Sequence, residues 1–366
     1  MKKIKRKTAI FTLLIFVSFL FVVSPVKMVN AYFSSFTIIA DGKKYLFYPP
    51  EIVYGLNGLN MVGIDKVVEK IANENQILPT DATVKFNPDS EQIFTFIKEK
   101  SGKRIDANKL KKKIERAFLV GERVVEIISE NVKAENTVEM LKAQTHLVSQ
   151  FSTEYTFSTT ERKSNIALAT SFISGFVLKP GQTFSFNEVV GIRSEERGFL
   201  TAKIIVDGKF VDGVGGGVCQ VSTTLYNAVL MAGIKVDESH NHSLRVDYVK
   251  PSFDAMVSDY FSDLKFTNNN QTPLYIAGYA DGEKLTFKIY GKPTNLRYEL
   301  LSSVVEVIEA KTVTEKKVTG EEVDVYPKNG LKSEGYLCVY DGEVLIEKIK
   351  LRSDTYKARD GIIYYE

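Results

Sequence analysis

Cysteine is scarce in this chain, which has only Cys219 and Cys338 among its 366 residues. Two thiols cannot build a disulfide scaffold, a four-thiolate zinc site or an iron–sulfur cluster, and the CxxCH motif that attaches haem covalently is missing. We therefore expect a protein without a metal or another cofactor. Each cysteine is either incidental to the fold or a chemical group.

A concentrated excess of one charge is also missing. There are 48 Lys and Arg residues against 45 Asp and Glu residues, a net charge of +3, but six of the basic residues precede residue 32. The remainder has 42 basic and 45 acidic residues and no basic face, so nucleic acid is not an expected partner. The share of hydrophobic residues (44%) and of charged residues (25%) is that of a globular protein, which excludes a disordered chain and a multi-spanning membrane protein.

Residues 1–31 have the pattern of an export signal. A basic head precedes an apolar run from Ala9 to Val23, and Val29-Asn30-Ala31 fits a signal-peptidase site. Counted on to Val26, the run has 18 residues, close to the lower limit of about 17–25 for a membrane helix. A cleaved signal peptide and a retained anchor in the cytoplasmic membrane both remain open. In either case the basic head stays in the cytoplasm, so we expect an extracytoplasmic protein.

The length leaves room for two or three domains after this leader. We predict an α+β protein with a mixed α/β module over residues 32–150, an α+β domain over 151–295 and a small all-β region over 296–366. The apolar residues of the first module predict a helix over Ile64–Ile71. A second helix begins at Asp106, a good N-cap residue.

Further elements are predicted on either side of residue 150. A helix is expected over Thr137–Phe151, with His146 in a structural role, and a capping box at Ser158–Glu161 begins another helix that ends at Ser174. Strands are expected over Phe184–Phe186 and Lys203–Val206.

The most informative stretch is GVGGGVCQVSTTLYNA, residues 213–228. Three consecutive glycines let the backbone turn sharply and lie close to a ligand, and the residues from Cys219 to Met231 then form a helix. Cys219 would lie in its first turn, where the helix dipole favours an anion and lowers the pKa of the thiol. This predicts a reactive thiolate.

An activated cysteine needs a base, and His240 and His242 follow at a short distance in the sequence. Asp254 comes 12 residues after His242, so Cys219, His242 and Asp254 can form a thiol triad. His240 competes as the base. This order is compatible with acyl transfer.

Three other interpretations of Cys219 remain open at this point. The residue can be a small buried hydrophobe with no chemistry. It can bind zinc together with His240, His242 and a carboxylate, although the close ligand spacing of zinc sites is missing. It can also pair with Cys338 in a disulfide, which export would permit.

The region from about Phe151 to Pro293 resembles the VanW domain. The stretches that carry this resemblance are FSTEYTFSTTERKSNIALA, LKPGQTFSFNEVVG, GGGVCQVSTTLYNAVL, NHS, FDAMV and DLKFTNNN, in the expected order. The preceding stretches TDATVKF and SGKRIDANKLKKKI resemble a small peptidoglycan-binding module. Residues 296–366 resemble no known family.

The resemblance implies an exported cell-wall protein of a family tied to glycopeptide (vancomycin) resistance, some clostridial members of which are L,D-transpeptidases. The family's nucleophile maps onto Cys219, and its His-Ser and Asp-Ala motifs map onto His242 and Asp254. One departure is Pro251-Ser252-Phe253, where glycine is common.

The function expected from the residues and the resemblance together is a peptidoglycan L,D-transpeptidase that forms 3-3 cross-links through a cysteine acyl-enzyme. Peptidoglycan stem peptides are the expected partner. Substrate binding or oxyanion stabilisation is expected from the residues around the cysteine, namely Gly216, Gly217, Gln220 and Ser222. The alternative is a non-catalytic peptidoglycan-binding envelope protein linked to glycopeptide resistance.

Overall fold

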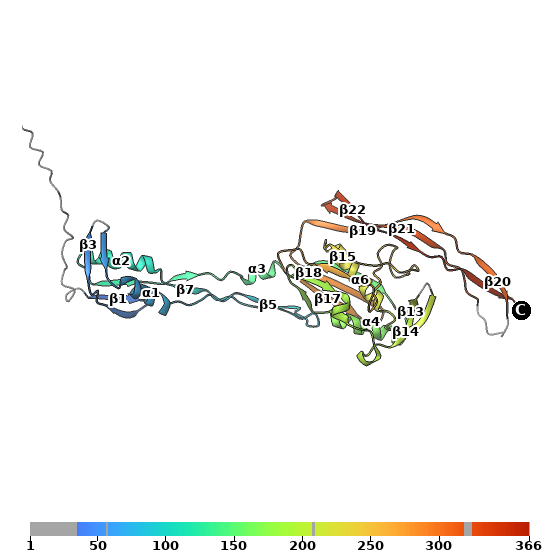
Figure 1. The fold of residues 1–366 in the computed structure, drawn as a ribbon, viewed down its shortest axis with the longest axis horizontal. Coiled ribbons are helices and arrows are strands. Elements are labelled where there is room, and N and C mark those ends of the chain that lie inside the picture. The colour runs from blue at the N-terminus through green and yellow to red at the C-terminus, as the bar shows by residue number, and fades with distance from the viewer. Residues whose placement is uncertain (1–34, 56–57, 207–208, 318–323, 366) are drawn as a thin grey trace, which may run out of the picture. The chain divides into compact units, whose positions relative to one another are not determined.

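The computed structural model describes residues 35–55, 58–206, 209–317 and 324–365. The predicted leader therefore lies outside the described residues. The chain divides into two compact units, one of residues up to 80 together with 100–135, the other of residues 81–99 together with 136–366 (Figure 1). Both units combine helices and strands, which confirms the α+β class. Among the described helices, none has the length and apolar character needed to span a membrane.

The first unit packs two amphipathic helices against a small sheet. The sheet has the order β2-β1-β8, with β1 and β2 antiparallel and β1 and β8 parallel. The predicted cap at Asp106 is confirmed, because its side chain accepts a hydrogen bond from the backbone N–H of Lys109. The elements of this unit are β1 (Phe36–Ala40), β2 (Lys43–Phe47), β3 (Ile52–Gly55), β4 (Gly58–Met61), α1 (Ile64–Glu74), β7 (Gly102–Arg104), α2 (Ala107–Leu119), β8 (Val124–Ile127) and β9 (Glu130–Val132).

The second unit is built on an antiparallel sheet with the order β10-β18-β17-β11. The helices α4 and α6 pack against this sheet and share its core. Helix α6 is buried along most of its length, its polar side chains included, because other elements enclose it. These elements are β10 (His146–Glu154), α4 (Thr160–Ile173), β11 (Phe176–Leu178), α6 (Val218–Met231), β17 (Leu274–Ala280) and β18 (Lys284–Gly291).

Shorter elements surround this core. A three-stranded sheet has the order β12-β16-β15, and β13 and β14 form a hairpin that leads into the glycine stretch. The remaining elements before residue 296 are β5 (Thr83–Phe86), β6 (Phe94–Ile97), α3 (Val138–Lys142), β12 (Thr183–Ser185), α5 (Phe186–Val190), the 3₁₀ helix η2 (Glu195–Arg197), β13 (Thr201–Val206), β14 (Lys209–Val214), β15 (Val236–Glu238) and β16 (Lys265–Thr267).

The carboxyl-terminal region consists of strands, as predicted (Figure 1). Two long antiparallel pairings give a sheet of order β19-β21-β22, and β20 pairs with β23 in parallel. The strands are β19 (Leu296–Ile308), β20 (Thr312–Lys316), β21 (Gly330–Asp341), β22 (Val344–Tyr356) and β23 (Gly361–Tyr365). They belong to the same compact unit as the central sheet. The predicted domain boundaries near residues 150 and 295 stay a prediction.

Two predicted elements differ in the structure. The helix expected over Thr137–Phe151 is wrong, because α3 ends at Lys142 and His146 begins strand β10. The cap of α4 is Thr159, whose hydroxyl accepts from the N–H of Arg162, one residue after the predicted Ser158.

A buried asparagine fixes the glycine stretch to α4. The side chain of Asn165 is fully buried, and its Nδ2 donates to the carbonyl oxygens of Leu200 at 2.8 Å and Gly216 at 3.0 Å. Its Oδ1 accepts from the N–H of Leu200 at 2.8 Å. These bonds satisfy backbone groups that are buried at Gly216 and partly buried at Leu200, and they place the start of α6.

We expect Asn165→Ala to lower the free energy of unfolding by about 2–4 kcal/mol, because it leaves buried N–H and C=O groups unpaired. Urea unfolding followed by circular dichroism measures this change. Asn269→Ala, in an exposed loop, serves as the control and should change the free energy little. An Asn165→Ala protein as stable as the Asn269→Ala protein would contradict this role.

Candidate active site

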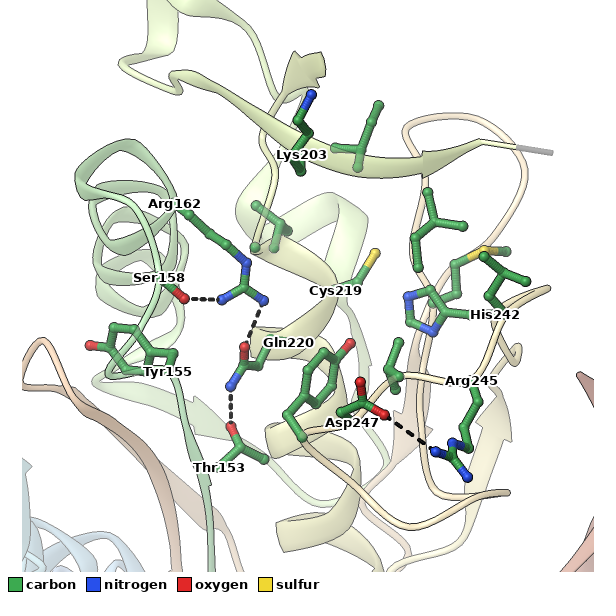
Figure 2. A pocket seen from close by; sticks show the side chains of 18 of the residues that line it. Thr153, Tyr155, Ser158, Arg162, Lys203, Cys219, Gln220, His242, Arg245 and Asp247 are labelled. Atoms are coloured by element: carbon green, nitrogen blue, oxygen red, sulfur yellow. Dashed lines mark hydrogen bonds and ion pairs between the residues drawn. The ribbon is translucent and has the colours of Figure 1, made fainter. Parts of the chain in front are cut away.

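A cleft of about 1250 Å³ opens above the start of α6 (Figure 2). Its lining comes from α4, the β13–β14 hairpin, α6 and the loops after residues 242 and 256. Residues of the carboxyl-terminal region, among them Lys328 and Lys357, line it as well. Residues distant in the sequence thus meet around one cysteine.

Cys219 is the second residue of α6 and is partly exposed in this cleft. The helix begins after Gly217, which has a φ of 108°, a backbone conformation that favours glycine. The thiol therefore lies in the first turn of the helix, at the positive end of its dipole, where a negative charge is favoured. The Sγ atom lies 3.4 Å from the carbonyl oxygen of Val257.

His242 joins Cys219 to Asp254. The imidazole lies within hydrogen-bonding reach of the thiol, and its Nδ1 is 2.7 Å from Oδ2 of Asp254. The backbone N–H of His242 donates to the same oxygen, also at 2.7 Å. His242 and Asp254 are only 5% and 1% exposed, so the ring is held in one orientation. The structure thus brings together the three residues of the predicted triad.

The pKa of Cys219 is lowered and the pKa of His242 is raised, as in a thiolate–imidazolium ion pair. Burial alone would raise the pKa of the Cys219 thiol, but the hydrogen bond and charge of His242, together with the charge of Arg193, lower it below its ordinary value. Burial alone would lower the pKa of His242, but hydrogen bonds to Asp254 and Cys219 raise it to about 9. Both directions favour the thiolate and imidazolium form of the pair over the neutral form.

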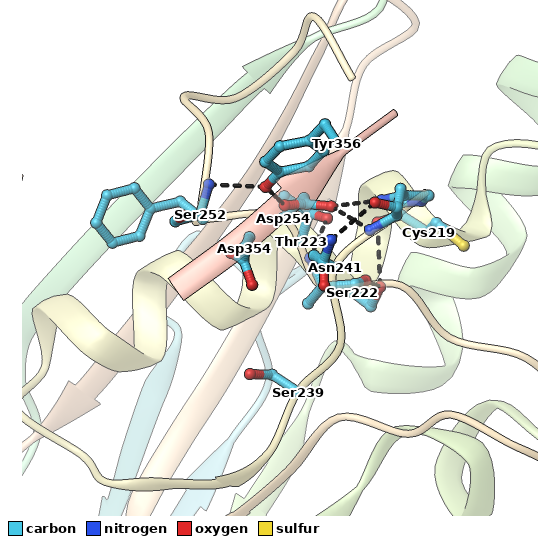
Figure 3. Close-up of polar contacts among 12 residues, drawn as sticks. Cys219, Ser222, Thr223, Ser239, Asn241, Ser252, Asp254, Asp354 and Tyr356 are labelled. Carbon is cyan, nitrogen blue, oxygen red and sulfur yellow. Dashed lines mark hydrogen bonds and ion pairs between the residues drawn. The ribbon is translucent and has the colours of Figure 1, made fainter. Parts of the chain in front are cut away.

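Strand β22 supplies two further donors to Asp254, and Figure 3 shows the one from Tyr356. The hydroxyl of Tyr356 donates to Oδ1 at 2.5 Å, and the Arg352 guanidinium donates to the same oxygen at 3.0 Å. Burial alone would raise the pKa of Asp254, but the His242 hydrogen bond and the charges of His242 and Arg352 lower it. Asp254 therefore stays ionised and able to orient the imidazole.

The segment Pro251-Ser252-Phe253, where VanW domains commonly have glycine, forms a turn just before Asp254. Ser252 has a φ of 65°, in the left-handed region that glycine adopts at the least cost. Its hydroxyl hydrogen-bonds the hydroxyl of Ser333 at 2.7 Å, and its N–H donates to the Tyr356 hydroxyl at 2.8 Å. A Cβ atom at Gly335 would lie 2.9 Å from the Ser252 carbonyl oxygen. The carboxyl-terminal strands therefore provide both the bonds and the space for a serine here.

The structure separates the two histidines. His240 is 3.0 Å from Glu238 through its Nε2, and its side chain is 42% exposed. His242 is therefore the histidine that faces the thiol. His146, at the first position of β10, is exposed.

The other predicted residues lie around Cys219 in different environments. Gly217 lines the cleft, whereas the Gly216 carbonyl accepts from Asn165. The Gln220 amide is fully used, because Oε1 accepts from Arg162 and Nε2 donates to Thr153 and Glu154. Ser222 is fully buried, with its hydroxyl donating to the carbonyls of Cys219 and Ala255.

The structure bears on each alternative interpretation of Cys219. The side chain packs against the core as a small hydrophobe would, but it is only partly buried. Both cysteines are free, so the disulfide with Cys338 does not form. Within the described residues, no group of three or more His, Cys, Asp and Glu side chains is arranged to hold a metal ion.

Sequence reasoning did not identify Arg352 and Tyr356 as part of the site, nor the arginines Arg162 and Arg193 in the cleft. Arg352 and Tyr356 lie in a region with no motif, so no local signal marks them. Arg162 lies in the stretch FSTEYTFSTTERKSNIALA. Its place near the start of a capped helix is a sequence feature that could have indicated a residue of the site.

Two known families match parts of the chain. Residues 161–290 match the family described as "VanW like protein", and residues 58–126 match the family described as "Putative peptidoglycan binding domain". The chain therefore contains a VanW-like domain, and the stretch that matches the second family precedes it. No solved structure matches it.

Two curated relatives are similar to the chain. "Uncharacterized protein YoaR" of Bacillus subtilis (strain 168) is 37% identical over 171 residues, which are 46% of this chain and 56% of the relative. "Vancomycin B-type resistance protein VanW" of Enterococcus faecalis (strain ATCC 700802 / V583) is 24% identical over 151 residues, which are 39% of this chain and 54% of the relative. The chain spans about half the length of these curated relatives.

Alkylation by iodoacetamide tests the pairing of thiol and imidazole. We expect the rate at Cys219 to reach half its maximum well below pH 8.5, since the thiolate forms as the pH rises through the lowered pKa, and then to stay level through pH 9. In His242→Gln the midpoint should rise, because burial then acts without the opposing imidazole. Cys338, which is 5% exposed in β21, is the internal control and should react slowly. Equal midpoints in the two proteins would contradict the pairing.

Tyr356→Phe tests the contribution of the carboxyl-terminal strands. The change removes a donor from a buried carboxylate and the acceptor of the Ser252 N–H, so we expect the free energy of unfolding to fall by about 1.5–3 kcal/mol. Urea unfolding measures it. Tyr336→Phe removes a similar hydroxyl–carboxylate bond, to Glu334, at the surface and should leave stability unchanged. Equal changes in the free energy of unfolding would show that the bond to buried Asp254 contributes no more to stability than a surface bond.

Proposed function

We propose that the chain is a peptidoglycan L,D-transpeptidase that works through a cysteine acyl-enzyme. The observation that carries this proposal is the line of Cys219, His242 and Asp254, in which Cys219 and His242 line the cleft and the thiol lies at the start of α6. A poised thiolate, a protonated imidazole and an orienting carboxylate are the parts that acyl transfer needs.

In the first step, the Cys219 thiolate attacks the carbonyl carbon between the third, L-configured residue of a tetrapeptide stem and its terminal D-alanine. The C–N bond breaks, and the imidazolium of His242 gives its proton to the leaving amino group. D-alanine departs and a thioester remains on the sulfur. A histidine pKa of about 9 keeps this proton available at neutral pH.

In the second step, an amine of a neighbouring stem attacks the thioester carbonyl. Neutral His242 accepts the proton of that amine, the C–S bond breaks, and the thiolate forms again. The product is a 3-3 cross-link. Water in place of the amine would give a tripeptide and hence carboxypeptidase activity.

The tetrahedral intermediates need a donor for their oxyanion. The N–H groups of Val218 and Gln220 donate to the carbonyls of Gly215 and Gly217. The N–H of Cys219 has no backbone partner among the described residues, and it lies at the positive end of α6. We assign the oxyanion to this group.

The rest of the chain supports work at the cell wall. The peptidoglycan-binding domain would hold the protein on its polymeric substrate, and the name of the Enterococcus faecalis relative links the VanW-like domain to vancomycin resistance. Both observations favour a location outside the cytoplasm, where stem peptides are cross-linked. Residues 1–31 would deliver the chain there.

Incubation of the purified chain with disaccharide-tetrapeptides, followed by mass spectrometry, tests the activity. We expect dimers that have lost one D-alanine. Cys219→Ala should form none, and Cys219→Ser should be nearly inactive, because a hydroxyl beside the same base is a much weaker nucleophile at neutral pH.

Cys338→Ala is the matched control and should keep full activity, since the other thiol is buried in β21. Binding to isolated cell walls should be the same in all four proteins. Full cross-linking by the Cys219→Ala protein would exclude the proposed mechanism, and tripeptide as the sole product would reassign the chain as a carboxypeptidase.

A further inference from the structure

Four arginines line the cleft, namely Arg162, Arg193, Arg245 and Arg359, and the partners of Arg162 and Arg193 differ. The Arg193 guanidinium is ion-paired with Asp259, at 2.7 Å between Nη1 and Oδ1. The described partners of Arg162 are neutral: Nη1 donates to the Ser158 hydroxyl and Nη2 donates to Oε1 of Gln220, each at 2.7 Å. Among the described residues, no carboxylate forms an ion pair with Arg162.

The Arg162 guanidinium is held beside the nucleophile. Its partner Gln220 follows Cys219 directly on α6, and the Gln220 amide is fixed because Nε2 donates to Thr153 and to the Glu154 carbonyl, each at 2.9 Å (Figure 2). Its side-chain stem packs against the start of α6, where a Cβ atom at Gly217 would lie 3.0 Å from Cγ of Arg162. The charge is therefore positioned by two helices and a strand.

This position of the Arg162 charge, with no paired carboxylate, lowers the stability of the folded chain until an anion binds. Burial lowers the pKa of Arg162, which shows that the charge is partly removed from water. The charge of Cys219 opposes this shift, but no carboxylate is paired with the guanidinium, which stays protonated even so. The guanidinium has five N–H donors, and the two described bonds leave others for a ligand in the cleft. Its planar fork matches a carboxylate.

We propose that Arg162 binds a carboxylate of the substrate, namely the free terminal carboxylate of the residue that leaves when Cys219 attacks. This inference rests on the proposed function. In a tetrapeptide stem, the carboxylate carbon of the terminal D-alanine lies two bonds from the amide nitrogen that departs. A cation fixed next to Cys219 reaches that group and orients the amide for attack. The site would then select stems that end one residue beyond the attacked carbonyl.

Alkylation by two reagents of similar size tests the anion site without any turnover. Iodoacetate carries a carboxylate and iodoacetamide does not, so the ratio of their rates at Cys219 reports the attraction for an anion. A change in the thiol pKa alters both rates alike and cancels in the ratio. We expect Arg162→Gln to lower the iodoacetate to iodoacetamide ratio about tenfold at 0.15 M salt.

Arg245→Gln is the matched control, because Arg245 lines the same cleft and is 3.6 Å from Asp247. It should change the ratio less than twofold. An unchanged ratio in an Arg162→Gln protein with unaltered melting temperature would overturn the proposal.

A second measurement needs only the unaltered protein, in case Arg162→Gln does not fold. N-acetyl-D-alanine should protect Cys219 from iodoacetamide at about tenfold lower concentration than N-acetyl-D-alaninamide. Equal protection by the two compounds would overturn the proposal.

Turnover separates this inference from the proposed function. With tetrapeptide donors, Arg162→Gln should lower kcat/KM about tenfold or more for the carboxylate form and leave the carboxamide form nearly unchanged. A carboxylate preference in alkylation without any cross-linking would retain the anion site and refute the transpeptidase. Cross-linking with no preference for the carboxylate would retain the transpeptidase and refute the role of Arg162.

Discussion

The Asp254 carboxylate is a buried charge that depends on donors from two separated parts of the chain. The loop that ends at His242 gives it a backbone N–H and an imidazole, and strand β22 gives it a hydroxyl and a guanidinium. An anion removed from water is unfavourable unless such partners surround it. The orientation of the imidazole, and with it the state of the thiol, therefore depends on packing between the central sheet and the carboxyl-terminal strands.

The sequence predicted the parts of this site that are local. Three glycines before an apolar helical stretch place Cys219 at a helix start, and the structure has α6 beginning at Val218. The α+β class and the cap at Asp106 followed from short patterns of the same kind. In each case a few neighbouring residues determine the local backbone, so that no distant contact has to be known.

What could not be predicted depends on contacts between distant residues. Arg352 and Tyr356 reach Asp254 across 98 and 102 residues, and alternation along a strand indicates which face is buried but not what covers it. The helix predicted over Thr137–Phe151 is wrong in the region of strand β10 for a similar reason. Its buried face carries Ser149, whose hydroxyl donates to the Ala228 carbonyl of α6, so a polar residue occupies a core position and hides the apolar alternation typical of a strand.

The distance between Asp254 and Tyr356 along the chain also has a consequence in time. Ribosomes add about 5–20 residues per second, so the 102 residues between them take roughly 5–20 seconds to synthesise. During that interval the carboxylate lacks two of its donors, and its burial is opposed by the full cost of an unpaired charge. The donors around Asp254 are therefore complete only after β22 has joined its sheet. Until its final strands are in place, a new chain holds an Asp254 that lacks two of its four donors.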